Sequence, residues 1–293
     1  MHLDDEDVAK LFAEEFAEES WKVERYDEAR KMFMQLIETP EQTSRFAALL
    51  LKLSFCCIVA GDVGEGESYF QRGVKILRGG PQCEPKCAED LALVAKRFAE
   101  QKWVKCSLFL MQIFVGLIKG IQKVEQQLDP SKKAAIGLLN LITIYKYDDA
   151  NQLVDKKYYY DDANQLVEDL ISCSRRGQEA PDDQNLVQWM LVMLMCINVF
   201  RMIGKFSSCL KYSEEAETAI VRLNDVDEKT FMKVMLLYSR FMISRESKKF
   251  VEAKHFFSEM ESMLPKIHEI TGTELKEESL QMFEQAKQLI SQF

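Results

Sequence analysis

The sequence is poor in the residues that interrupt helices. Its 293 residues include 12 glycines and 6 prolines, whereas an average protein has roughly 7% glycine and 5% proline. It also lacks segments in which apolar and polar residues alternate, the pattern of a half-buried strand. These absences argue against a β-sandwich or barrel and predict an all-α fold.

Long apolar runs and an excess of positive charge are missing as well. The two longest apolar stretches, Ser107–Ile118 and Trp189–Phe200, are about 12 residues long, and a bilayer needs about 20, so we expect no membrane span. The net charge of −9 argues against nucleic acid as a partner bound through overall basic charge. Asp4–Asp7 are acidic where a signal peptide would be basic, so we expect a cytoplasmic or nuclear protein.

Patterns of catalytic and metal-binding residues are also scarce. His2, His255 and His268 are isolated along the chain, and no metalloprotease, nucleophile-elbow or P-loop pattern occurs. Cys83 and Cys87 form a pair without a second pair or a nearby histidine, which does not make a zinc site. We therefore predict no catalytic residues, no metal site and no cofactor. The eight cysteines are interpreted as reduced residues, most of them in the core.

What the sequence does contain is a recurring triplet of an aromatic, a small and a bulky residue. Tyr26, Ala29 and Phe33 are spaced three and four apart, on one face of a helix. Variants of this spacing recur at Val63/Gly66/Phe70, Trp103/Cys106/Leu110, Tyr147/Ala150/Val154, Tyr160/Ala163/Val167, Phe206/Cys209/Ser213 and Phe250/Ala253/Phe257. An apolar-periodic segment precedes the triplets, so each unit is predicted to be a helical hairpin. Gly116 and Gly120 are predicted to mark close packing of helices.

Glycine, proline and asparagine clusters give the predicted boundaries. They include Pro40, Gly79–Pro81, Asp129–Pro130 and Pro265, all of which interrupt helices. We predict one domain, 1–293, with hairpins at about 7–40, 44–79, 88–121, 131–176, 184–223 and 228–264 and a capping helix at 274–293.

The spacing resembles the tetratricopeptide repeat, whose standard form has 34 residues. The first hairpin carries the resemblance through Ala17, Tyr26, Ala29, Phe33 and Pro40, and the sixth through Leu237, Phe250, Ala253, Phe257 and Pro265. The resemblance implies a right-handed α-solenoid of about six hairpins, in which stacking of neighbours supplies the core. It also implies a protein-binding groove lined by the first helix of each hairpin.

A tandem duplication interrupts the pattern. Tyr147–Asp155 reappears as Tyr160–Glu168 with one difference, and a shift of 13 residues turns a helix face by about 220°. Both copies therefore cannot present the same face of one straight helix. We expect the second copy to be the packed one, because Leu166, Val167, Leu170 and Ile171 continue its apolar stripe. The first copy is predicted to lengthen the turn or the preceding helix, either as a tolerated duplication or as a binding protrusion.

Five cations fall on the predicted first helices of three successive hairpins: Lys52, Lys96, Arg97, Lys132 and Lys133. If they line the groove, they would attract an acidic or amphipathic segment of a protein partner. Ordinary surface cations are the alternative interpretation.

Together these patterns predict a non-enzymatic scaffold or adaptor within a larger intracellular assembly. The alternative is a helical-bundle enzyme or lipid-handling protein that resembles the repeats only in outline. That alternative requires carboxylates or histidines clustered around an enclosed pocket.

Overall fold

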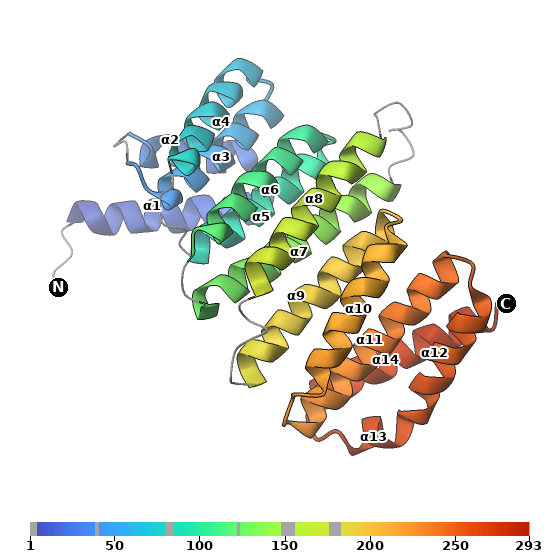
Figure 1. The fold of residues 1–293 in the computed structure, drawn as a ribbon. Helices are drawn as coiled ribbons and strands as arrows, with labels where there is room; N and C mark the ends of the chain where they lie inside the picture. The colour runs from blue at the N-terminus through green and yellow to red at the C-terminus, as the bar shows by residue number, and fades with distance from the viewer. Residues whose placement is uncertain are drawn as a thin grey trace. The chain divides into compact units, whose positions relative to one another are not determined.

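The structure is a computed structural model that describes residues 5–38, 41–79, 85–121, 124–147, 156–175 and 183–292. The regular structure in these ranges is entirely helical (Figure 1), which confirms the all-α prediction. Helices pack mainly against their neighbours in the sequence. The chain divides into two compact units, Met1–Gln122 and Lys123–Phe293, and each is described by itself.

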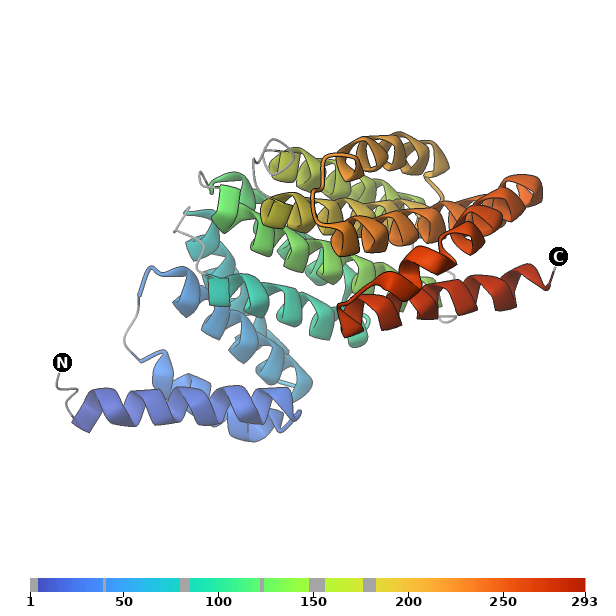
Figure 2. The ribbon, with the colours of Figure 1, turned by 90° about the horizontal axis from the view of Figure 1, so that it is seen from below.

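The first unit contains three helical hairpins. They pair α1 (Asp5–Lys22) with α2 (Tyr26–Leu36), α3 (Ser44–Val59) with α4 (Val63–Arg78), and α5 (Pro85–Glu100) with α6 (Val104–Lys119). The second and third hairpins also contact each other: α3 packs against α5, and α4 packs against α6. Helix α1 lies at the edge of the unit (Figure 2), and two of its side chains, Phe12 and Phe16, are exposed there.

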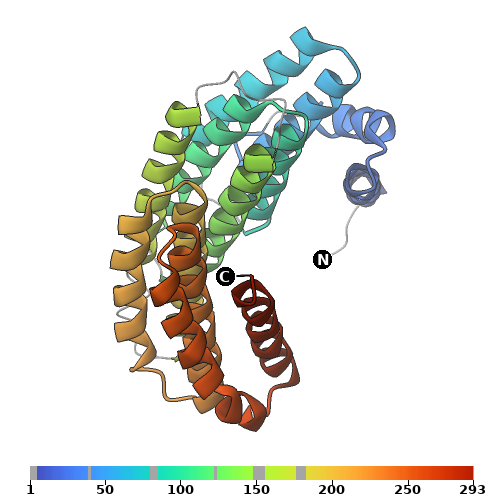
Figure 3. The ribbon, with the colours of Figure 1, turned by 90° about the vertical axis from the view of Figure 1, so that its right-hand side faces the viewer.

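The second unit continues with α7 (Val124–Tyr147), α8 (Lys156–Ser174), α9 (Asp183–Met202), α10 (Phe206–Ile220), α11 (Val226–Glu246) and α12 (Phe250–Ser262). After the short α13 (Leu264–Glu269), the chain turns back as α14 (Thr273–Ile290), which packs against α11 and α12 (Figure 3). Phe283 and Ala286 of α14 are buried in this contact. A helix therefore occupies the segment that was predicted to cap the chain.

Helix α7 begins earlier than predicted. Pro130 was expected to separate two hairpins, but it lies inside α7, which starts at Val124. A proline in a helix interior removes one backbone donor and crowds the preceding turn. The helical turn around Pro130 is buried. In it, the Ser131 hydroxyl donates a hydrogen bond to the Gln127 carbonyl over 2.8 Å.

Five of the connections within hairpins have the same backbone conformation. The residue at positive φ, between +62° and +93°, is Glu24, Gly61, Lys102, Gly204 or Lys248. The next residue has φ between −83° and −91° and ψ between 58° and 67°. Its N–H donates to the carbonyl five residues earlier over 2.7–2.9 Å. A left-handed residue after a helix C-terminus satisfies carbonyls that the helix leaves free, so each of these turns closes in the same way.

The shared turn places a small residue at the same point of each second helix. Ala29, Gly66, Ser107, Cys209 and Ala253 are the fourth residues of their helices, and all are buried. They lie where the two helices of the hairpin cross. A Cβ added to Gly66 would lie 2.9 Å from the Ser54 carbonyl oxygen, and the Ser107 hydroxyl donates to the Ala95 carbonyl over 2.5 Å.

The predicted burial of Ala29 and Ala253 is confirmed, since both are 0% exposed. The third triplet was predicted one residue too early. Lys102 takes the left-handed position of the turn, so Ser107 is the small residue at the crossing, whereas Cys106 is half-buried.

Ala29→Leu is expected to lower the free energy of unfolding by about 1–3 kcal/mol, because the added carbons must enter a filled helix crossing. Urea denaturation measures the loss. The control is Lys31→Leu on the exposed side of the same helix, where a change below about 0.5 kcal/mol is expected. Equal midpoints for both variants would show that the assigned crossing is wrong.

Helix α9 forms the centre of the second unit. Among the described residues it is the one helix long and apolar enough to cross a membrane, and 61% of that apolar stretch is buried within the protein. Trp189, Met193 and Ile197 are each 0% exposed. Most of this apolar stretch is thus packed against the rest of the protein.

The second copy of the duplicated segment lies in α8 as expected. Ala163, Val167 and Leu170 are 0% exposed, and Leu166 and Ile171 are also buried. In the first copy, residues 148–155 lie outside the described part of the chain.

Candidate functional site

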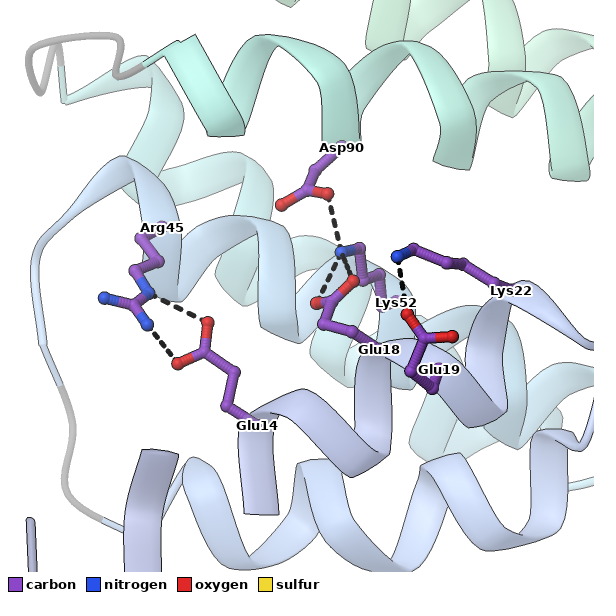
Figure 4. Close-up of polar contacts among 7 residues, drawn as sticks. All are labelled: Glu14, Glu18, Glu19, Lys22, Arg45, Lys52 and Asp90. Carbon is purple, nitrogen blue, oxygen red and sulfur yellow. Dashed lines mark hydrogen bonds and ion pairs between the residues drawn. The ribbon is translucent and has the colours of Figure 1, made fainter. Parts of the chain in front are cut away.

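An ionic network joins the first helices of the three hairpins in the first unit (Figure 4). At its centre, the Nζ of Lys52 on α3 lies 2.6 Å from both carboxylate oxygens of Glu18 on α1. The same nitrogen lies 2.7 Å from Oδ1 of Asp90 on α5. The Lys52 side chain is 0% exposed, and those of Glu18 and Asp90 are 12% and 13% exposed. One buried cation thus connects three helices.

This geometry corrects the prediction that Lys52 binds a partner. Its ammonium group donates to two carboxylates of the same protein and has no solvent-accessible surface. A buried charge is stable only when it is paired and hydrogen-bonded. Lys52 therefore holds the hairpins together, and its partners lie 34 and 38 residues away in the sequence.

The neighbouring predicted cations are also paired with acidic residues. Arg97 donates to the carboxylate of Glu24 and to that of Glu100, the latter over 3.3 Å, and its side chain is 16% exposed. Lys96 is 44% exposed and forms one pair with Glu100 on its own helix, at 3.6 Å. Of the three predicted cations in this unit, Lys96 is therefore the most accessible.

The remaining two predicted cations belong to the second unit. Lys133 pairs with Asp129 one helical turn away, with 2.7 Å between Nζ and Oδ2, and Lys132 is half-buried on the same helix. The five cations are thus divided between the two units. Partner binding by Lys96, Arg97, Lys132 and Lys133 stays a prediction.

The buried thiols are poor nucleophiles. Burial raises the pKa of Cys57 to about 11 and that of Cys209 to about 12, so both stay protonated at neutral pH. Thiolate, the reactive and metal-binding form, is suppressed under these conditions. In the described ranges no three His, Cys, Asp or Glu side chains are placed to hold a metal ion. Cys83, half of the pair noted in the sequence, lies outside those ranges.

A surface groove, here called the α4–α6 groove, runs between the second helices of two neighbouring hairpins in the first unit. It consists of two adjoining depressions of about 510 and 380 Å³. Arg78 and Phe109 line both depressions, and the Arg78 guanidinium carbon lies 4.9 Å from the centre of the Phe109 ring. The first is also lined by Phe70, Val74 and Lys75, and the second by Leu77, Ile113, Gly116 and Leu117.

Little in the sequence indicates this groove. Gly116 was interpreted as a point of close helix packing, but a Cβ added there would meet no heavy atom within 4 Å. The missing side chain instead leaves open space in the groove. Phe70 and Phe109 could have signalled an aromatic lining, but only the packing of α4 beside α6 brings them together.

The sequence matches no protein-family model and no curated protein. The resemblance to tetratricopeptide repeats thus rests on the residue spacing and stays a prediction.

Proposed function

We propose that this chain is a non-enzymatic scaffold or adaptor built from tetratricopeptide-like hairpins, and that it serves as a subunit of a larger intracellular assembly. The observation that carries the proposal is the turn shared by five hairpins, with its left-handed residue and its hydrogen bond to the carbonyl five residues earlier. The same conformation occurs in both units. A common turn that places a small residue at each helix crossing favours a repeated module over a set of unrelated helix pairs.

Contacts between hairpins support the same proposal. In the second unit, Lys205 pairs with Asp161, and Tyr212 donates to Glu168. Both contacts span 44 residues. Since Lys205 and Tyr212 follow Asp161 and Glu168 by about one hairpin, corresponding parts of neighbouring hairpins face each other. Such regular nearest-neighbour contacts are typical of a solenoid, and we extend the proposal to a right-handed α-solenoid of about six hairpins.

A second recurring contact connects the start of a first helix to the residues that precede a later helix. The Asp183 carboxylate at the start of α9 accepts hydrogen bonds from the N–H groups of Asn224 and Asp225, over 2.8 and 3.0 Å. Asp227 at the start of α11 accepts from the N–H of Thr271 over 2.9 Å. In both places a carboxylate at the start of one helix binds the segment just before a later helix, α11 in the first case and α14 in the second.

The proposed partner is an acidic or amphipathic protein segment on the first-helix surface. Lys96 is the most accessible of the predicted cations in its unit, and Lys132 is the corresponding candidate in the other. The alternative function, a helical-bundle enzyme or lipid-handling protein, calls for titratable groups around an enclosed pocket. The α4–α6 groove, by contrast, is a surface groove lined by apolar side chains, two cations and the amides of Gln71 and Gln112.

Site-specific photo-crosslinking in native cells tests this proposal. A photoreactive amino acid at Lys96 or Lys132 is expected to capture one discrete protein. The same group at Val251, which lies on a second helix and is 84% exposed, is expected to capture little. Absence of a specific adduct at both first-helix positions would contradict the proposal.

The captured partner then allows a binding measurement. Its acidic segment should bind the purified chain less tightly as salt is raised, since salt screens exposed charge pairs. Lys96→Glu should weaken binding about tenfold, and Lys254→Glu on α12 should leave it unchanged. An equal effect of both reversals would place the contact elsewhere.

A further inference from the structure

The charged side chains that line the α4–α6 groove are all cationic. Its charged lining residues are Lys75 and Arg78, both on the last turns of α4. Among the residues that the structure describes, neither forms an ion pair, whereas Arg30, Lys52 and Arg97 are all bound to carboxylates. Two cations without a carboxylate partner thus lie beside an apolar floor in a chain of net charge −9.

The apolar floor is held by aromatic packing. The ring of Phe70 lies 5.6 Å from that of buried Phe98 and 6.3 Å from that of Phe109, measured between ring centres. Val74 and Leu77 are buried beneath the groove. Side chains fixed in this way can accept an apolar group with little loss of conformational entropy.

Arg78 lies between the two depressions. It lines both of them, and its guanidinium lies over the Phe109 ring. Stacking on an aromatic ring leaves the N–H edge of a guanidinium free to bind a carboxylate with two hydrogen bonds. A ligand for this groove should therefore offer apolar groups to the two depressions and a carboxylate between them.

We propose that the α4–α6 groove binds a segment of a protein partner in which an aspartate or glutamate lies between two bulky apolar residues on one face. The cationic lining selects the acidic residue, and the depressions accept the apolar ones. Helix-in-groove recognition uses anchors spaced in this way. The groove lies on second helices, so it is a further surface beyond the first-helix surface of the proposed function. It needs only α4 and α6, and it does not depend on the hairpins forming a solenoid.

Two substitutions alter the groove, and each has a matched control. Arg78→Glu reverses the charge between the depressions, and Arg72→Glu makes the same reversal elsewhere on α4, outside the groove lining. Gly116→Leu fills the second depression, and Gly64→Leu adds the same side chain outside it. An added Cβ meets nothing within 4 Å at either glycine, so both leucine variants should fold.

The measurement is fluorescence anisotropy with the full chain and a panel of labelled helical peptides. Each peptide carries leucine, phenylalanine or tryptophan at positions i and i+7 and glutamate at i+4, which lie on one helical face. We expect at least one peptide to bind. Its dissociation constant should rise about tenfold or more with Arg78→Glu and with Gly116→Leu, and should change less than about twofold with either control. Glutamine in place of the peptide glutamate should weaken binding to the natural chain but not to Arg78→Glu.

Several results would overturn the proposal. One is failure of the whole panel to bind at about 1 mM, and another is binding that neither groove variant alters. Self-association that Arg78→Glu or Gly116→Leu abolishes would assign the groove to a second copy of the chain. Arg78-dependent binding to anionic vesicles without peptide binding would assign it to a lipid surface.

Circular dichroism checks that each variant is folded. If Arg78→Glu unfolds, Arg78→Gln, which removes the charge without reversing it, replaces it.

Discussion

Lys52→Met is expected to lower the free energy of unfolding by about 3–5 kcal/mol. The substitution removes the ammonium group that lies 2.6 Å from Glu18 and 2.7 Å from Asp90. The two carboxylates would then face each other in a largely buried space without a cation. Removing one partner from a buried ion pair leaves an uncompensated charge, and this is the origin of the large loss. Urea denaturation of the full chain measures it.

Two further variants separate this cause from a loss of packing. Lys96→Met, at an exposed lysine with one pair on its own helix, should change stability by less than about 0.5 kcal/mol. The triple variant Glu18→Gln, Lys52→Met, Asp90→Asn removes all three charges and should recover most of the lost stability. If the triple variant is as unstable as Lys52→Met, uncompensated charge is not the cause.

Phe55→Ala should cost a similar amount, about 3–5 kcal/mol, for a different reason. The Phe55 side chain is 0% exposed. Its ring centre lies 5.1 Å from that of Trp21, 5.2 Å from Tyr26, 5.3 Å from Phe98 and 6.2 Å from Trp103. Truncation would leave a cavity among aromatic rings from the first and third hairpins of the first unit.

The matched control is Phe250→Ala. Phe250 is 45% exposed, so its truncation should cost about 1 kcal/mol or less. Phe55→Leu keeps most of the buried volume and should restore most of the stability lost in Phe55→Ala. Thermal and urea unfolding both test the comparison. Similar losses for Phe55→Ala and Phe250→Ala would contradict the central role of the aromatic cluster.

The hairpins could be predicted from the sequence because their determinants are local. The spacing of Tyr26, Ala29 and Phe33 reflects one face of one helix, and the scarcity of glycine and proline reflects helix propensity. The burial of Ala29 and Ala253 follows from the same spacing. Where the local pattern was ambiguous, the predicted position of the small residue was shifted along the sequence. At the third hairpin, Trp103 and Cys106 match the pattern one residue before the true crossing at Ser107.

The surroundings of the candidate site residues could not be predicted in the same way, because they are not local. In the sequence, Lys52 has the features of a surface lysine. Only in the fold do α1 and α5 bring Glu18 and Asp90 to its ammonium group. Arg97 meets Glu24 across 73 residues. The α4–α6 groove similarly depends on the packing of two second helices. Periodicity identifies the face of a helix that is buried, but it does not identify which distant charge or ring that face will meet.

The contacts of Arg97 have a consequence for how the first unit unfolds. In an array of repeats that touch only their immediate neighbours, terminal modules can fray one at a time. Here Arg97 of the third hairpin binds Glu24 in the turn of the first, and Lys52 joins α1 to α5 through α3. Opening either outer hairpin therefore breaks contacts of the other two. The three hairpins should behave as a single foldon, with backbone amides that exchange through a common opening rather than in order from the chain terminus.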